Sequence, residues 1–144
     1  MSNSGFLISQ VKQVQDRVFD ALLRKNGIGE FNGAQGRILY VLWQEDNLPI
    51  VELSRRTALA KTTLTSMLDR MESNGFLIRS YDKADRRQTR ILLTEKAKSL
   101  NIKYENVTNV MIQLFYKNFT EDEIITFEHL LERILDNLHE SESK

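Results

Sequence analysis

The stretch that decides the fold runs from Asp82 to Thr94 and reads Asp-Lys-Ala-Asp-Arg-Arg-Gln-Thr-Arg-Ile-Leu-Leu-Thr. Its first half carries two adjacent arginines, and its second half is an apolar run typical of a strand. A turn that leads into a strand holds its side chains on a fixed base and directs them outward. We therefore expect a hairpin with a positively charged tip.

Two helical patterns precede this hairpin, at about 50–57 and 61–74, and the strands are expected at about 76–80 and 89–93. In the second pattern Leu64, Met67, Leu68 and Met71 form an i, i+3, i+4, i+7 stripe that packs inward. The remaining expected helices lie at about 4–25, 33–46, 95–117 and 121–139. Helix, turn, helix and hairpin in this order are typical of a DNA-binding domain.

The run from Val51 to Thr94 resembles the winged helix-turn-helix domain of the MarR family of bacterial transcription regulators. The resemblance is carried by a helix that ends in Asn74-Gly75, an Asp-Arg-Arg wing that begins at Asp85, and Leu93-Thr94. It covers nearly the whole chain and implies a mainly α fold with a small β-hairpin wing. It also implies that 1–144 is one protomer, with the DNA-binding region at 33–94 and dimerisation helices at 1–25 and 95–144.

The outward face of the 61–74 helix is rich in short hydroxyl side chains. These side chains are either simply solvated or placed to enter a major groove, where short polar groups reach base edges and phosphates. Threonine forms helices less well than the Lys, Glu or Gln usual on a solvated face, which favours the second reading. The family resemblance places Lys61, Thr62, Thr63, Thr65, Ser66 and Arg70 towards DNA.

Two residues depart from the family pattern. Several relatives have arginine where this chain has Ser66, so the resemblance does not imply direct reading of guanine at that position. Ala58 stands in a helix-to-helix turn where glycine is common.

The arginines of the wing have two interpretations. Beside Asp82 and Asp85 they could form a self-paired hairpin tip, although exposed ion pairs contribute only about 0 to 1 kcal/mol. The resemblance instead implies that Arg86 enters the minor groove while Asp85 and Arg87 brace the hairpin. Two further arginines on the strands, Arg90 and Arg79, are expected to touch phosphate or to shield the edge of the sheet.

Charge is distributed unevenly along a chain whose net charge is zero. Nine basic residues stand against four acidic ones between residues 54 and 90, whereas residues 120–144 hold eight acidic residues against two basic ones. Phosphates would repel the second segment, so only the first can face DNA.

Apolar residues cover more than one face of the last expected helix, which a chain of 144 residues cannot bury within itself. A second copy of the chain can bury them, and the resemblance also implies a homodimer. Thr120-Glu121-Asp122-Glu123 is a capping box that starts this helix.

Several other classes of protein are excluded or disfavoured. There is no cysteine for disulfides or thiolate chemistry. No apolar run approaches the roughly 20 residues that span a bilayer, and the N-terminus lacks the features of a signal peptide, so we expect a cytoplasmic protein and no membrane partner. The two histidines, His129 and His139, have no glycine-rich loop or metal-spaced cluster beside them, so we expect no enzyme, no cofactor and no metal. A weak zinc site at His129 with Glu128 or Glu132 is a minor alternative.

The sequence thus predicts a sequence-specific DNA-binding regulator, a dimeric repressor that binds an inverted-repeat operator in double-stranded DNA. The resemblance also implies a small aromatic or anionic effector in a crevice near Arg37, Tyr40, Trp43 and Tyr104, although Trp43 alone is more typical of a core. A winged-helix protein-interaction module without DNA binding remains the alternative, because Ser66 departs from the family.

Overall fold

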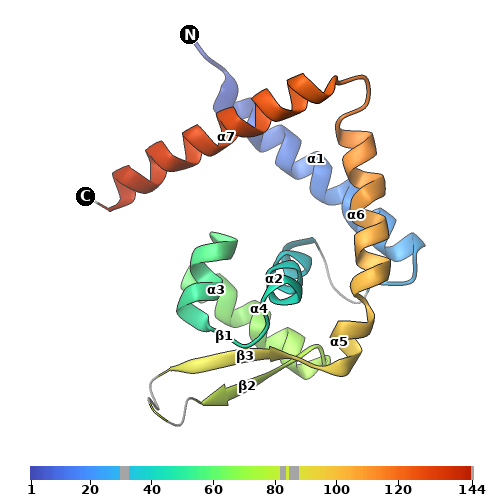
Figure 1. Ribbon diagram of the computed structural model, residues 1–144, viewed down its shortest axis with the longest axis vertical. Coiled ribbons are helices and arrows are strands. Elements are labelled where there is room, and N and C mark those ends of the chain that lie inside the picture. The colour runs from blue at the N-terminus through green and yellow to red at the C-terminus, as the bar shows by residue number, and fades with distance from the viewer. Residues whose placement is uncertain (30–32, 82–83, 85–87, 144) are drawn as a thin grey trace. The chain divides into compact units, whose positions relative to one another are not determined.

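The computed structural model describes residues 1–29, 33–81, 84 and 88–143. Helices dominate, and one small antiparallel sheet lies among them (Figure 1). None of the helices within these ranges combines the length and apolar character that a bilayer-spanning segment requires. The elements are α1 (Ser4–Lys25), α2 (Gly33–Gln44), β1 (Leu48–Pro49), α3 (Ile50–Thr57), α4 (Lys61–Ser73), β2 (Leu77–Tyr81), β3 (Thr89–Leu93), α5 (Glu95–Ser99), α6 (Asn101–Phe115) and α7 (Glu121–Glu142).

The chain divides into two compact units, Met1–Thr108 and Asn109–Lys144, with the boundary inside α6. The first unit has the hydrophobic core. Its α2 is apolar on most of its surface, and Ile38, Leu39 and Leu42 are at most 1% exposed. These side chains belong to the same core cluster as the inner faces of α3 and α4 and the inward residues of the sheet.

The sheet has the strand order β1-β3-β2. The predicted hairpin is confirmed: β2 pairs with β3 in an antiparallel register that runs from Leu77↔Leu93 to Tyr81↔Thr89. Strand β1, whose Leu48 pairs with Ile91, was not predicted from the sequence. Two residues are too short a run for periodicity to reveal, and proline, which lacks an amide hydrogen, is tolerated here because β1 is an edge strand.

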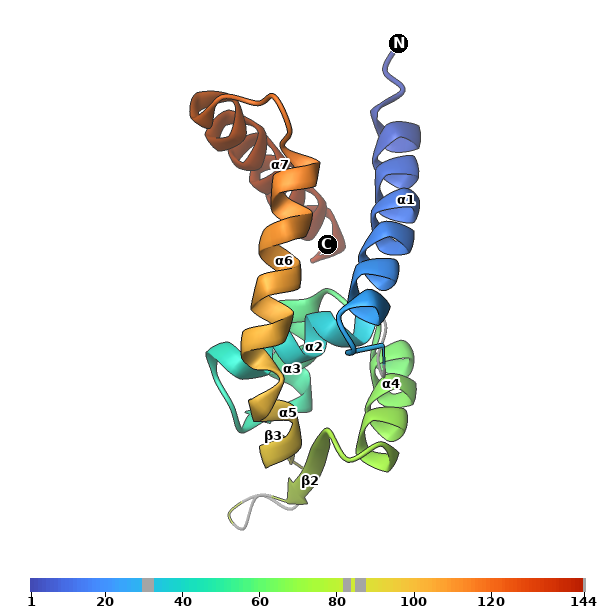
Figure 2. The ribbon, with the colours of Figure 1, turned by 90° about the vertical axis from the view of Figure 1, so that its right-hand side faces the viewer.

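One long helix was expected over 95–117, but the structure divides it into α5 and α6 (Figure 2). The carbonyl oxygen of Ala97 accepts hydrogen bonds from the amide of Leu100, at 3.2 Å, and from the indole Nε1 of Trp43, at 3.0 Å. These two hydrogen bonds mark the break between α5 and α6, because the indole of Trp43, which belongs to α2, occupies the carbonyl of Ala97 near the end of α5. Thr94 starts α5 by accepting a hydrogen bond from the amide of Ala97.

The second unit contains the end of α6 and the whole of α7. The predicted capping box is present, since the Thr120 hydroxyl accepts from the Glu123 amide while the Glu123 carboxylate accepts from the Thr120 amide. Tyr116 donates a hydrogen bond of 2.8 Å to Glu128. Desolvation, together with this hydrogen bond, raises the pKa of Tyr116 to about 12. His129 is exposed, and the described residues include no cluster of three side chains suited to hold a metal ion.

Candidate nucleic-acid interface

The turn between α3 and α4 is held by side-chain hydroxyls. Thr57 donates a hydrogen bond of 2.7 Å to the carbonyl of Leu53, and Ser54 donates one of 2.9 Å to the carbonyl of Leu59. Between them Ala58 has φ 59° and ψ 20°, in the left-handed region that glycine adopts more readily. These contacts fix how the second helix follows the first.

Helix α4 has one buried and one exposed face. Leu64, Leu68 and Met71 are fully buried in the hydrophobic core. The residues of α4 that were expected to contact DNA are all exposed: Lys61, Thr62, Thr63, Thr65, Ser66 and Arg70. Six of the nine predicted contact residues are therefore exposed on one helix.

Arg79 connects β2 to α4 through two ion pairs. Its guanidinium lies 2.7 Å from Asp69 and 2.7 Å from Glu72, and its side chain is only 20% exposed. Arg79 was expected to touch phosphate or to shield the edge of the sheet, and its ion pairs with Asp69 and Glu72 were not predicted from the sequence. The pairs neutralise two carboxylates of α4, whereas Lys61 and Arg70 form no ion pair with any described residue.

Helix α3 carries a second paired cluster. Glu52 accepts hydrogen bonds from Arg55 and Arg56, and Arg56 also reaches Glu45 at 3.0 Å. The hydrogen bonds from Arg55 and then Arg56 lower the pKa of Glu52 from its ordinary value to about 2. The two arginines of α3 are thus paired within the protein.

The predicted wing residues are only partly described. Arg86 and Arg87 lie outside the described residues. Arg90 is half-buried on β3 and donates a hydrogen bond of 2.9 Å to the carbonyl of Asn47, which ties β3 to the turn before β1. The guanidinium of Arg90 therefore has an internal partner that the sequence did not reveal.

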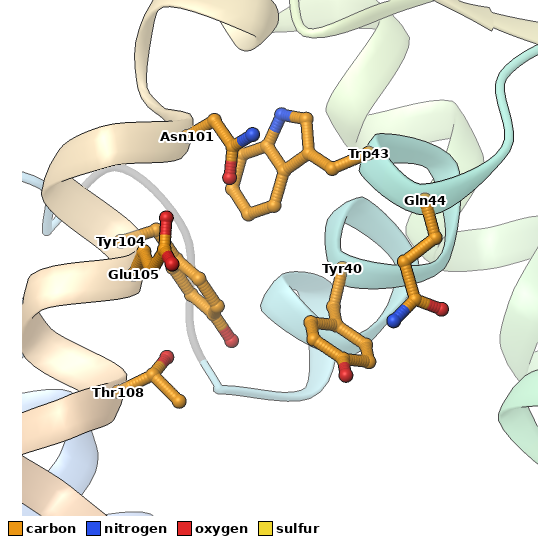
Figure 3. Close-up of a pocket in the computed structure, with 7 residues that line it drawn as sticks. All are labelled: Tyr40, Trp43, Gln44, Asn101, Tyr104, Glu105 and Thr108. Carbon is orange, nitrogen blue, oxygen red and sulfur yellow. The ribbon is translucent and has the colours of Figure 1, made fainter.

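A pocket of about 320 Å³ lies between α2 and the first turns of α6 (Figure 3). Of the four residues expected near a crevice, Tyr40, Trp43 and Tyr104 line it, and Arg37 is not among the lining residues. Trp43 and Tyr104 pack with ring centroids 5.0 Å apart. Burial raises the pKa of Tyr104 to about 12. The other lining residues are Gln44, Asn101, Glu105 and Thr108.

Comparisons with known proteins connect this geometry to a family. The model of the MarR family matches residues 31–89. The multiple antibiotic resistance protein MarR of Escherichia coli is 30% identical over 132 residues, which cover 91% of this chain and 90% of that protein. The chain belongs to the MarR family. The family consists of transcription regulators rather than enzymes, in agreement with the prediction.

The MarR fold is also found in solved structures. The crystal structure of E. coli MarR C80S with operator DNA superposes with a TM-score of 0.81 at 29% identity, and the match covers 91% of this chain and 92% of that one. The winged helix-turn-helix fold predicted from the sequence is confirmed. Other relatives match over shorter stretches: TtmR of Methylorubrum extorquens is 38% identical over 76 residues, and the chain spans 39% of that regulator's length and 64% of YsmB of Bacillus subtilis.

Proposed function

We propose that this MarR-family protein is a repressor that binds double-stranded DNA sequence-specifically, as a homodimer on an inverted-repeat operator, and that a small-molecule effector releases it. The observation that carries the proposal is the exposed polar face of α4. Lys61 and Arg70 have no ion-pair partner among the residues that the structure describes, while Arg79 pairs with the carboxylates of Asp69 and Glu72.

The side chains of α4 suit a major groove. Thr62, Thr63, Thr65 and Ser66 are short, so the helix backbone can approach the base edges closely. The N-cap residue Ala60 provides no side-chain hydrogen bond, so the amides of the first turn are available to a phosphate. Lys61 and Arg70 add two exposed cations to the same helix.

The wing is assigned on the sequence and its place in the fold. We assign Arg86 to the minor groove, Arg87 to bracing of the hairpin, and Arg90 to the positioning of β3 beside the phosphates. Minor-groove insertion reads groove width and potential more than base identity. The ion pairs of Arg79 support this arrangement because they join β2 to the helix assigned to the major groove.

Exposed apolar side chains support the homodimer. On α1, Phe6 is 64% exposed and Leu7 is 49% exposed. On α7, none of the residues is buried, although the helix carries several large aliphatic side chains. Exposed apolar surface of this extent typically marks a protein interface. Two copies would bring two α4 helices to two half-sites with centres about one helical turn apart, roughly 34 to 36 Å.

The test is a mobility-shift and footprinting measurement on genomic fragments, beginning with the DNA beside the protein's own gene. We expect a protected inverted repeat and submicromolar affinity that weakens with added salt. The alternative, an interaction module that has lost DNA binding, rests on serine at position 66. Absence of a footprint on every fragment, in protein that is folded and dimeric, would favour that alternative.

A further inference from the structure

We propose that the pocket between α2 and α6 takes an organic cation, a protonated or quaternary amine joined to a ring or a compact alkyl group, rather than an aromatic acid. Its regulatory meaning rests on the proposed function, since only a DNA-binding repressor can be released by a ligand. The ligand chemistry itself is independent of DNA.

Aromatic rings form most of the apolar wall of the pocket. Tyr40, Trp43 and Tyr104 line it, and the rings of Trp43 and Tyr104 are tilted by 53° with centroids 5.0 Å apart. Figure 3 shows Tyr40 and Trp43 on α2, and Tyr104 projecting from α6 towards them. The face of an aromatic ring attracts a cation within about 6 Å of its centroid.

One hydrogen-bond donor of the lining residues is already in use. The indole Nε1 of Trp43 donates to the carbonyl of Ala97 at 3.0 Å. A carboxylate in the pocket therefore could not accept from this group, and the described lining residues include no arginine or lysine. An anion would lose its hydration without a charged partner, which is costly.

The charge in the pocket is negative. Among the described residues that line the pocket, Glu105 is the one side chain that carries a formal charge. Arg37 and Asp20 lie close enough to the Tyr104 hydroxyl to affect its pKa, but they act in opposite directions and neither lines the pocket. The carboxylate of Glu105 therefore favours a positively charged ligand over a negatively charged one.

An unsatisfied acceptor stands beside this carboxylate. The hydroxyl oxygen of Thr108 is buried and has no hydrogen-bond partner within the described part of the chain. A buried hydroxyl without a partner is destabilising, so a rotation of the Thr108 side chain that presents its oxygen to a ligand N–H group would be favoured. In Figure 3 the side chains of Thr108 and Tyr104 project from the same side of α6. Ammonium donors, aromatic faces and a carboxylate are complementary at this pocket.

The experiment uses three ligands that share one ring and differ in charge: benzylamine, which is protonated at pH 7, benzyl alcohol and benzoate. Trp43 is the only tryptophan of the chain, so quenching of intrinsic fluorescence reports on this pocket directly. We expect benzylamine to bind about tenfold more tightly than benzyl alcohol, and benzoate to bind most weakly. Benzoate affinity equal to or above that of benzylamine would overturn the proposal.

Variants of exposed residues separate charge from shape. Glu105→Gln should weaken benzylamine roughly fivefold and leave benzyl alcohol unchanged, because it removes the charge and keeps the volume. Glu105→Lys should reverse the preference, so that benzoate binds more tightly than benzylamine. Tyr40→Leu removes one ring from a side chain that is 50% exposed, and should weaken benzylamine about threefold.

Glu121→Gln on α7 is the matched control, because it changes the net charge equally but lies outside the pocket. Equal losses in Glu105→Gln and Glu121→Gln would contradict a local role for the carboxylate. A separate arm adds saturating benzylamine to the protein–operator complex. If benzylamine binds but DNA is not released, the ligand class is supported and effector release by it is refuted. If the protein binds DNA but not benzylamine, only the ligand class is refuted.

Discussion

Ala58 is the residue whose backbone is least suited to its side chain. It adopts φ 59° and ψ 20° in the turn between α3 and α4, where the Cβ of any residue other than glycine meets the following carbonyl. Ala58→Gly should therefore stabilise the protein, by about 1 kcal/mol in the free energy of unfolding. Urea denaturation measures the change.

Ala21→Gly on the exposed side of α1 is the matched control, since the same chemical change inside a helix should destabilise by about 1 kcal/mol. If Ala58→Gly and Ala21→Gly changed the free energy of unfolding in the same direction, the conformation of Ala58 would not be the cause.

Glu52 makes stability depend on acid. Hydrogen bonds from Arg55 and Arg56 lower its pKa to about 2, against an ordinary value of 4.5. A lowered pKa means that the unfolded chain binds the proton first, so the stabilisation is present above about pH 4.5 and is lost as the pH falls towards 2. We expect the difference in unfolding free energy between the protein and Glu52→Gln to be constant above pH 5 and to shrink below it. A difference that does not vary down to pH 2 would contradict the pairing.

The exposure of the candidate site residues on α4 could be predicted from the sequence, because the helical period decides which face is buried. Buried Leu64 and Leu68 place Thr62, Ser66 and Arg70 on the opposite face of α4. Contacts between residues far apart in the chain were not predicted. The ion pairs of Arg79 with Asp69 and Glu72 could not be predicted, because they depend on how β2 packs against α4. Two carboxylates three residues apart on a helix were nevertheless a signal in the sequence for a shared cation.

At the scale of elements, the approach of α2 to α6 depends on one glycine. A Cβ at Gly36 would lie 2.7 Å from Cε2 and 2.8 Å from Cζ of Tyr104, a residue that is only 6% exposed. Gly36→Ala should destabilise the protein by about 1 to 3 kcal/mol, because it overpacks this contact. Thermal and urea denaturation measure the loss.

Gly5→Ala is the control for helix propensity, because a Cβ there meets nothing within 4 Å. It should stabilise α1 or leave stability unchanged. If the contact with Tyr104 causes the loss, Gly36→Ala should lower the free energy of unfolding less when Tyr104→Leu is also present. An equal loss with and without Tyr104→Leu would show that the strain does not come from this contact.

The elements themselves were predicted wherever a local signal exists. Helices α1, α3 and α4 begin and end within a residue of their expected bounds, and Thr120 caps α7 as its motif indicates. Strand β1 exists only because Leu48 pairs with Ile91, and the α5–α6 break depends on Trp43, which comes from another helix. Neither partner is local, so periodicity could not show these features.

At the scale of the whole molecule, we expect the apolar residues of α7 to form the proposed dimer interface. Ile134 is 42% exposed in the single chain, in a helix without any buried residue. Ile134→Glu should convert the dimer to a monomer or to insoluble protein, because it places a charge in the proposed shared core. Light scattering at micromolar concentration measures the mass. Glu132→Gln, a polar change on the same helix, should leave the dimer intact.

An Ile134→Glu protein that stays a soluble dimer would contradict the use of this face for assembly. A monomeric mass for the unchanged protein would contradict the homodimer itself, and with it the two-fold symmetric operator.

The central claim is that the exposed face of α4 binds DNA, and the salt dependence of operator affinity for Lys61→Ala tests it most directly. Lys103 on α6, also an exposed lysine, provides the control variant Lys103→Ala. We predict that Lys61→Ala weakens all duplexes and lowers the slope of log affinity against log salt by about one phosphate contact, while Lys103→Ala matches the unchanged protein. Operator affinity and slope that are the same in Lys61→Ala as in the unchanged protein would contradict the claim.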